Sequence, residues 1–299
     1  RARAAAEKEL AELRDKAGAE IEPWDVAYWL EKLKEDKYSL SNEVLRRYFP
    51  QNKVTDGLFS LAERLYNDKL AERSDVEAWH ETVSYFSVRD ADGDELGGFY
   101  TDLFARAGKR SGAWIDECVT RKSFNGQLTL PVGYLVCNFP PPGDEGRSLI
   151  THDDVVTLFH EFGHMLHHLL TRIEYPSVAG INGVPWDAVE LPSPFMENFA
   201  WNYDVLSGCS EHADTGEHLP RELFDRLDDA RHCGTALAMM RQLEFALFDF
   251  LVHAEYDAKS GSRVLDKVAE VRHEISLLTH PDYNRFSHSF AHILSLIHI

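Results

Sequence analysis

The chain has 299 residues, of which 44% are hydrophobic, and a formal net charge of −19. This length and composition can bury a large core, either as one large domain or as two smaller ones. The negative charge excludes the basic surfaces that bind nucleic acids or anionic membranes, and the sequence contains no apolar run of about 20 residues that could span a bilayer.

Amphipathic helices are predicted in the first 80 residues. Apolar side chains recur at intervals of three and four residues in the segments 24–36, 56–72 and 74–80. Ser74 and Glu77 fit a capping box at the start of the last of these segments. We therefore expect residues 1–80 to be helical.

Residues 82–139 have the alternating patterns of β-strands. The segments 82–88 and 95–104 flank the turn DADGD at 90–94, which predicts a β-hairpin. A further strand is predicted at 131–139, PVGYLVCNF, and the Pro- and Gly-rich loop that follows ends it. These strands predict one small sheet.

Helices return after this sheet. Thr151 and Asp154 resemble a capping box and predict the start of a helix that runs into a histidine-rich segment. Further helices are expected near 195–208, 220–232, 235–257 and 262–277. The predicted fold class is therefore mainly α, with a small β-sheet just before the histidine-rich helix.

That segment, LFHEFGHMLHH at 158–168, contains the motif H-E-x-x-H as His160, Glu161 and His164. On a helix this spacing places both imidazoles on one face, one turn apart, where they can bind a single metal ion. Glu161 lies about 100° around the helix from His160, close to the ion without being forced to ligate it. Gly163 points the same way, because a glycine inside a helix is unfavourable and suggests that another backbone comes close.

A catalytic zinc site needs a third protein ligand. The pattern H-E-x-x-H-x-x-G-x-x-H is excluded, because His167 and Leu170 occupy its last two required positions. His167 lies on the ligand face, two turns from His160, and is expected to support the site from behind the ligands or to pack in the core.

The third ligand is therefore expected to be a glutamate. Glu174 would lie about 15 Å along the helix from the second histidine, which is too far. Glu190 and Glu197 are seven residues apart and would share one helical face, so that one could ligate and the other could orient a ligand. Pro192 and Pro194 predict that a helix begins there, but the spacing leaves both assignments open.

Two segments carry a family resemblance. HEFGHMLHHLL, followed by GVPWDAVELPSPFMENFAW, resembles the thimet oligopeptidase and neurolysin family of zinc metallopeptidases. The likeness extends through nearly the whole chain, including WDVAYWLEKLK, GFYTDLFARAGKRSGAW, YLVCNF and RQLEFALFDF. It implies a zincin-like catalytic region, with a small sheet packed against the H-E-x-x-H helix, within a larger helical architecture.

The resemblance also implies roles for single residues. One zinc ion per chain would be held by His160, His164 and Glu190, with Glu161 as the general base and Glu197 behind the ligands. The strand YLVCNF resembles the edge strand along which such enzymes bind an extended substrate.

The end of the chain departs from the family pattern. His292 matches a family histidine that assists substrate binding or stabilises the oxyanion, but the tyrosines expected after it are missing, and the chain ends in LSLIHI. This ending can be encoded by a transposase-end adaptor, so we expect 294–299 to be a non-native tail. Residues 1–293 would then be a fragment of a catalytic domain, in which 82–139 supplies the sheet, 151–208 the zinc-binding helices and 220–293 further helices.

The expected function is that of a zinc-dependent endopeptidase that cleaves short unfolded peptides by Glu161-assisted attack of water. Its partners would be peptide substrates, without nucleic acid or membrane, and a monomeric cytoplasmic protein is expected. One alternative is a truncated zinc-binding fragment with little or no catalysis, since each lost oxyanion donor costs about 10²- to 10³-fold in rate. Another is an exopeptidase with similar zinc chemistry.

Overall fold

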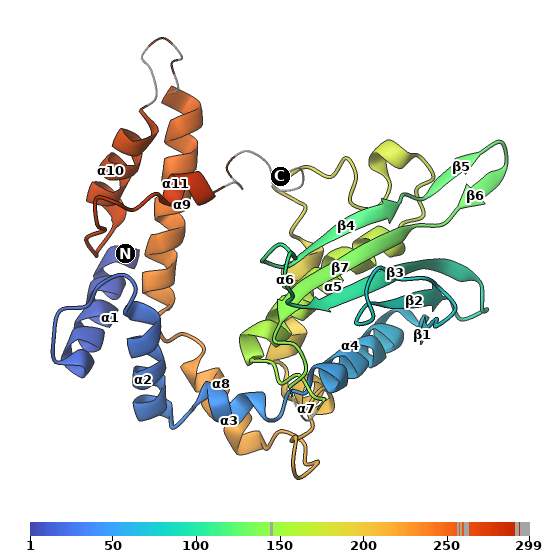
Figure 1. The fold of residues 1–299 in the computed structure, drawn as a ribbon, viewed down its shortest axis with the longest axis horizontal. Helices are drawn as coiled ribbons and strands as arrows, with labels where there is room; N and C mark the ends of the chain where they lie inside the picture. Colours follow the sequence, from blue (N-terminus) through green and yellow to red (C-terminus); the bar gives the residue numbers. More distant parts are fainter. Residues whose placement is uncertain (144–145, 256, 258, 260–262, 291–292, 294–299) are drawn as a thin grey trace. The chain divides into compact units, whose positions relative to one another are not determined.

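The computed structural model describes residues 1–143, 146–255, 257, 259, 263–290 and 293 (Figure 1). The chain forms two compact units, one of residues 42–225 and the other of residues 1–41 together with 226–299. No helix among the described residues is long and apolar enough to cross a membrane.

The unit of residues 42–225 contains a five-stranded mixed sheet in the order β1, β2, β3, β7, β4 (Figure 1). In that order the strands span Lys69–Glu72, Ser84–Arg89, Glu95–Phe104, Val132–Phe139 and Trp114–Val119. A separate hairpin of β5 (Lys122–Phe124) and β6 (Gln127–Thr129) follows β4. The chain is thus mainly helical with a small sheet.

The pairing of the strands confirms one sequence prediction and corrects another. β2 and β3 form the predicted antiparallel hairpin around the turn at 90–94. β7 corresponds to the strand predicted at 131–139, but it lies inside the sheet, parallel to β3 and antiparallel to β4. The prediction that it is the edge strand was therefore wrong, and β4 is the strand at this edge. β4 was missed because its sequence, WIDECV, mixes apolar and charged residues.

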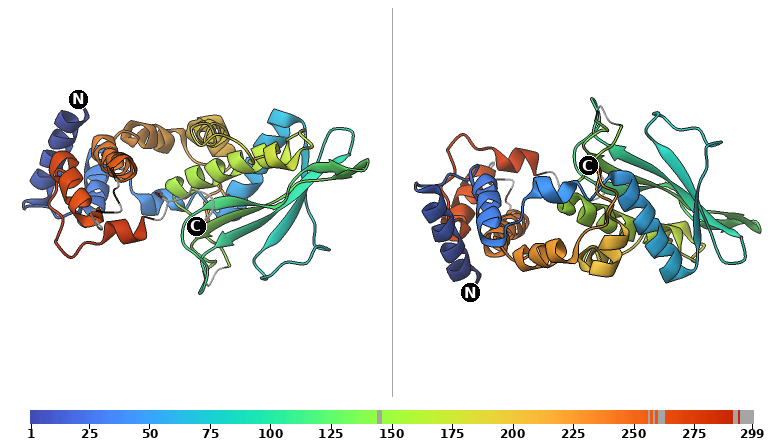
Figure 2. Two further views of the ribbon diagram at one scale, coloured as in Figure 1. Left: turned by 90° about the horizontal axis from the view of Figure 1, so that it is seen from above. Right: turned by 90° about the horizontal axis from the view of Figure 1, so that it is seen from below.

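Two helices cover one face of the sheet, α4 (Gln51–Tyr66) and α5 (His152–Leu169) (Figure 2). Phe99 of β3 lies between them, with its ring centroid 5.8 Å from that of Phe59 on α4 and 5.9 Å from that of Phe162 on α5. All three rings are buried or half-buried. This apolar layer fixes the histidine-rich helix against the sheet.

α5 begins with the predicted capping box. The Thr151 hydroxyl accepts a hydrogen bond from the backbone N–H of Asp154, and the Asp154 carboxylate accepts one from the backbone N–H of Thr151. This reciprocal pair satisfies two of the free donors at the helix start. Farther along, Gly133 of β7 meets Met165, whose sulfur would lie 2.7 Å from a Cβ atom at Gly133.

Two predictions for the segment before the sheet need correction. The helix predicted at 56–72 is α4, which begins earlier and ends at Tyr66, and β1 follows it. The helix predicted at 74–80 was wrong, because this segment forms turns. Its polar groups bind locally and to the sheet: Arg73 pairs with Asp75, and the indole N–H of Trp79 donates to Asp102 of β3.

Short helices complete this unit. They are α3 (Asn42–Arg46), η1 (Pro176–Val178), α6 (Pro192–Glu197), η2 (Asn198–Trp201) and α7 (Tyr203–Gly208), and α8 (Arg221–Ala230) contains the boundary between the units. α6 begins at Pro192, where the sequence predicts a helix start.

The other unit is helical. Its elements are α1 (Ala2–Ala17), α2 (Val26–Tyr38), α9 (Thr235–Glu255), α10 (Val264–Ile275) and α11 (Phe286–Ser289). One apolar cluster is centred on Leu13, Ile21 and Leu33, and a second is centred on Phe248, Val268 and Val271. The bounds of α9 and α10 agree within two residues with the helices predicted at 235–257 and 262–277.

Candidate metal centre

Three side chains of the unit 42–225 converge at the middle of α5. The Nε2 atoms of His160 and His164 lie 3.2 and 3.0 Å from Oε2 of Glu190, and one ligand atom from each of the three residues lies within 4.8 Å of the others. His164 is buried, whereas about half of the Glu190 side chain is exposed. The structure thus brings together the two motif histidines and one of the two glutamates that the spacing left open.

Glu190 reaches this position because α6 packs closely on α5. Gly163 makes the approach possible: a Cβ atom there would lie 2.6 Å from the carbonyl oxygen of Pro192 and 2.8 Å from Cα of Ser193. Both neighbours are backbone atoms, which cannot rotate away. The Ser193 hydroxyl, which is fully buried, donates to the Glu190 carboxylate at 2.8 Å and holds its orientation.

Glu197 contacts the opposite nitrogen of the first histidine. Its Oε1 lies 2.6 Å from Nδ1 of His160. A carboxylate here accepts the Nδ1 proton, which leaves the Nε2 lone pair of His160 directed towards Glu190 and His164. The geometry therefore separates the two glutamates: Glu190 lies among the histidine Nε2 atoms, and Glu197 orients one ring from behind.

Glu161 is buried beside this group, with 7% of its surface exposed. Burial raises the pKa of its carboxyl to about 7, against the smaller opposing effect of His160, and Glu190 raises it further. A carboxyl group with a pKa near neutrality can both accept and release a proton, which is the property that a general base needs.

The other two histidines of the segment 158–168 are not part of the metal group. His167 is half-buried, its Nδ1 has no hydrogen-bond partner, and burial lowers its pKa. His168 is fully buried, with its Nε2 atom turned towards the sheet. His292 and the tail 294–299 lie outside the described residues.

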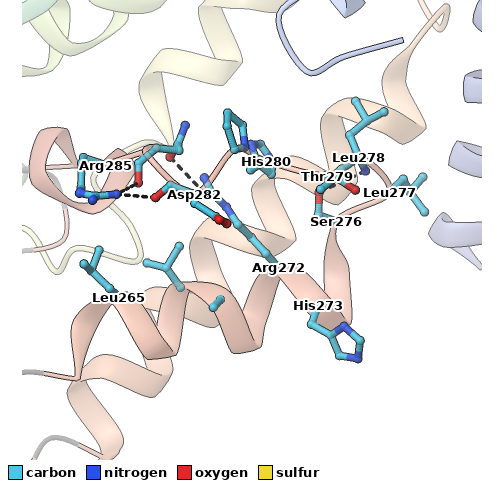
Figure 3. A pocket seen from close by; sticks show the side chains of 14 residues that line it. Leu265, Arg272, His273, Ser276, Leu277, Leu278, Thr279, His280, Asp282 and Arg285 are labelled. Atoms are coloured by element: carbon cyan, nitrogen blue, oxygen red, sulfur yellow. Dashed lines mark hydrogen bonds between the residues drawn. The ribbon is translucent and has the colours of Figure 1, made fainter. Parts of the chain in front are cut away.

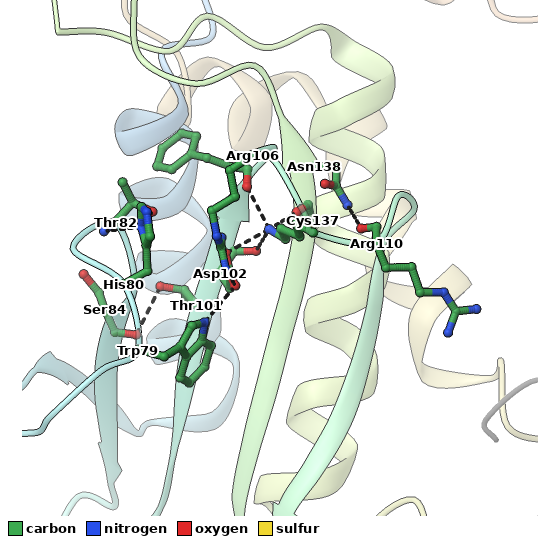
Figure 4. A network of polar contacts seen from close by, with 12 residues as sticks. Trp79, His80, Thr82, Ser84, Thr101, Asp102, Arg106, Arg110, Cys137 and Asn138 are labelled. Carbon is green, nitrogen blue, oxygen red and sulfur yellow. Dashed lines mark hydrogen bonds and ion pairs between the residues drawn. The ribbon is translucent and has the colours of Figure 1, made fainter. Parts of the chain in front are cut away.

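A second polar cluster, which sequence reasoning missed, lies where β3 and β7 end (Figure 4). Asp102 is buried and accepts hydrogen bonds from Arg106 and from Nζ of Lys109, the latter at 2.8 Å. The same ammonium donates to the carbonyl oxygens of Phe104 and Cys137, at 2.9 and 2.6 Å. This cluster fixes the loop that leads into β4. Asp102, Arg106 and Lys109 lie within eight residues of one another, but only the tertiary structure places the Lys109 ammonium against Cys137 on β7.

A pocket in the other unit lies between α10 and the segment 276–285 (Figure 3). It has a volume of about 520 Å³. Its arginines are engaged within the unit: Arg272 donates to Glu244 at 2.8 Å, and Arg285 donates to the carbonyl oxygen of Asp282 at 2.7 Å. None of the residues of the metal group lines this pocket.

The donor set fits zinc. Two imidazole nitrogens and one carboxylate oxygen form a common ligand set of catalytic zinc sites, which leave a fourth position open. Donor atoms about 2.1 Å from a tetrahedral zinc ion lie about 3.4 Å from one another. The separations of 3.2 and 3.0 Å from Glu190 to the two histidines are close to that value.

The fold and the site define a class of protein in which a helix bearing H-E-x-x-H packs on a mixed β-sheet and a glutamate in the turn just before α6 supplies a carboxylate. Residues 1–299 match peptidase family M3. The chain belongs to this family.

The similar proteins include bacterial peptidases. The chain is 49% identical over 301 residues to oligopeptidase A of Salmonella typhimurium and, likewise, to oligopeptidase A of Escherichia coli. It is 35% identical over 283 residues to dipeptidyl carboxypeptidase of Escherichia coli. The first two alignments cover 99% of this chain and 44% of the relative, and the third covers 94% and 41%. The chain thus spans less than half the length of these relatives.

Proposed function

We propose that this chain is the metal-binding portion of a zinc-dependent oligopeptidase that hydrolyses peptide bonds in short, unfolded peptides. The observation that carries the proposal is the grouping of His160, His164 and Glu190, with Glu161 buried beside them. Membership of a peptidase family and relatives named oligopeptidase A support peptides as the substrate class. A monomeric cytoplasmic protein, as expected from the family resemblance, stays a prediction.

Each residue has a distinct task in this mechanism. His160, His164 and Glu190 would hold the zinc ion, with Glu197 keeping the ring of His160 in position. When bound, zinc supplies Lewis acidity, which lowers the pKa of water and polarises a carbonyl group. Glu161 would accept the proton of the attacking water and pass it to the amine that leaves.

The peptide would bind along β4. Within the described chain, β4 pairs with β7 on one side and with no strand on the other. The backbone N–H and C=O groups on an open strand edge can pair with an extended peptide. This assignment transfers the predicted edge-strand role from β7 to β4. The role of His292 in binding substrate or stabilising the oxyanion stays a prediction.

The decisive experiment is Glu161→Gln, assayed with a quenched peptide substrate blocked at both ends. We expect turnover to fall about 10²- to 10⁴-fold, because the variant loses the general base. The zinc content should stay at one ion per chain. Glu174→Gln is the matched control, since Glu174 is exposed and absent from the metal group. Turnover by Glu161→Gln at the level of this control would refute the assigned role.

The same assay tests the truncated-fragment alternative. Turnover that a chelator abolishes and added zinc restores supports catalysis by this chain. If the chain binds one zinc ion but cleaves no peptide, it is a zinc-binding fragment, and the missing part of the longer protein is needed for activity.

Exopeptidase activity is the competing specificity, because one relative is named dipeptidyl carboxypeptidase. An endopeptidase cleaves peptides whether their ends are blocked or free. Rapid cleavage of peptides with a free C-terminus, together with no cleavage after amidation, would favour the exopeptidase.

A further inference from the structure

We propose that His168 is a positioning residue that fixes the edge strand β4 against the metal-binding helix α5. It thereby sets where a peptide paired with β4 lies relative to the metal centre. The peptide part of this inference rests on the proposed function, whereas the contact of His168 with the sheet does not depend on it.

The ring of His168 spans two strands. It follows the ligand His164 by one helical turn and is fully buried. Its Nε2 atom lies 3.2 Å from the carbonyl oxygen of Val119 at the end of β4, and 3.2 Å from that of Val132 at the start of β7. Val119 and Val132 are partners in the β4–β7 ladder. One side chain of the metal-binding helix therefore contacts both the end of β4 and the start of β7.

The chemistry of the contact fixes the state of the ring. Both partners of Nε2 are carbonyl oxygens, which can only accept, so Nε2 must carry the proton. The other nitrogen, Nδ1, is buried without a hydrogen-bond partner, and a Cβ atom at Gly180 would lie 2.7 Å from it. A proton added there would create a buried, unpaired cation. His168 is therefore a neutral donor that points at the sheet, and its Nε2 is not available as a metal ligand.

The contact lies where the ladder itself is irregular. The register of β4 against β7 shifts between Glu117 and Val119. The Glu117 carboxylate accepts a hydrogen bond from the side-chain amide of Asn182 at 2.6 Å. The end of β4 thus depends on side chains for its position, and His168 supplies the direct link to α5.

The start of β4 is held differently. The side-chain amide of Asn138 on β7 donates to the carbonyl oxygen of Arg110 at 2.8 Å (Figure 4). It also donates to the carbonyl oxygen of Gly112 at 2.6 Å, and both acceptors lie in the loop that enters β4. These contacts tie β4 to the sheet rather than to the metal-binding helix. Loss of His168 should therefore loosen β4 relative to α5 and leave β4 attached to β7.

Three substitutions distinguish the effect of the Nε2 hydrogen-bond donor from the effect of the volume of the imidazole ring. His168→Leu keeps an apolar side chain but removes the donor. His168→Gln places an amide nitrogen as many bonds from Cα as Nε2 and keeps the donor. His168→Asn keeps the amide but shortens its reach to that of Nδ1, and so serves as the matched control for polarity. Each zinc-loaded variant of the full chain would be compared by amide hydrogen exchange of residues 114–119, by zinc affinity, and by KM and kcat for the quenched peptide.

We expect His168→Leu and His168→Asn to exchange amide hydrogens in 114–119 about tenfold faster than the unaltered chain, because the carbonyls of the half-buried Val119 and Val132 lose the hydrogen bond from Nε2. KM should rise about tenfold with kcat changed less than about threefold and zinc affinity less than about twofold. His168→Gln should restore both the exchange rate and KM.

Three results would overturn the proposal. These are unchanged exchange and KM in His168→Leu, a His168→Gln variant that behaves like His168→Leu, and a loss of zinc affinity as large as the rise in KM. If the unaltered chain cleaves no peptide, the proposed function fails for this chain. The exchange rates of the variants then still decide whether His168 fixes β4.

Discussion

The two compact units bury different kinds of side chain. In the unit formed by 1–41 and 226–299, Glu244 is the buried polar residue among those described, and its carboxylate pairs with Arg272 within an otherwise apolar core. In the unit 42–225, buried polar groups are spread over the sheet, α5 and α6, and include His152, Glu161, His164, His168, Ser193 and Asp102.

The difference follows from what each unit holds together. Burying a polar group is unfavourable unless it finds a partner, so a unit selected for stability alone uses few of them. In 42–225, Glu161 and His164 lie at the metal group, Ser193 orients Glu190, and His168 contacts the strands beside α5. Unusual polar burial therefore identifies the candidate site.

Removal of Glu190 should have the largest effect on the metal centre. Glu190→Ala should weaken zinc binding roughly 10³-fold. This value follows if the total binding free energy of a zinc site, about 10–16 kcal/mol, is divided among a few protein ligands and one of them is removed. Glu197→Ala should weaken it about 10- to 100-fold, because Glu197 acts through His160. Competition with a chromogenic chelator measures both values, with Glu174→Ala as the control. A larger loss for Glu197→Ala than for Glu190→Ala would reverse the assignment.

A methyl group added at Gly163 should have the next largest effect. Gly163→Ala introduces a Cβ atom 2.6 Å from the carbonyl oxygen of Pro192, so α6 must move and carry Glu190 with it. We expect zinc affinity to fall about 10- to 100-fold, although alanine favours an isolated helix by about 1 kcal/mol.

Gly208→Ala in α7 is the matched control for this change, because a Cβ atom there meets nothing within 4 Å. Zinc titration of the two variants compares them directly. Equal affinities would show that close packing of α6 on α5 does not position the ligand.

The Asp102 cluster should matter more for stability than for the metal. Burial alone would raise the pKa of Asp102, but the hydrogen bonds from Arg106 and Lys109 outweigh it and lower the pKa to about 2. A depressed pKa stabilises the fold above the unfolded value of 3.8, and this contribution is lost as pH falls through about 2. By linkage it amounts to roughly 2–3 kcal/mol.

Asp102→Asn should therefore reduce the free energy of unfolding at pH 7 by about 3 kcal/mol, since the buried ammonium of Lys109 loses its charged partner. The acid-dependent part of the stability should disappear with it. Urea unfolding between pH 2 and 7 measures both, with the exposed Asp92→Asn as the control. We expect zinc affinity at pH 7 to change about threefold or less, and an unchanged free energy of unfolding would contradict the role of the cluster.

A substitution in the unit formed by 1–41 and 226–299 should have the smallest effect on zinc affinity. Glu244→Gln leaves Arg272 without its charged partner and should destabilise that unit, which thermal unfolding will detect. Zinc affinity should stay within about twofold of the unaltered chain, because the metal group lies entirely in 42–225. A zinc affinity that falls with Glu244→Gln would break the contrast between the two units.

The sequence by itself determined those features that depend only on residues close together along the chain. The i,i+4 spacing of His160 and His164 places two imidazoles on one helical face wherever a helix forms, and the capping box at Thr151 fixes where that helix begins. The hairpin around 90–94 was equally readable, because alternation and turn residues are local signals.

The tertiary structure decided the parts that depend on distant segments. Glu190 and Glu197 have the same residue type, and their spacing did not separate them. The packing of α6 against Gly163 places one on the Nε2 side and the other on the Nδ1 side of His160. The identity of the edge strand depended on the pairing of β7 with both β3 and β4. The alternating pattern of a strand records which side chains are buried, and it contains no information about which strands lie beside it.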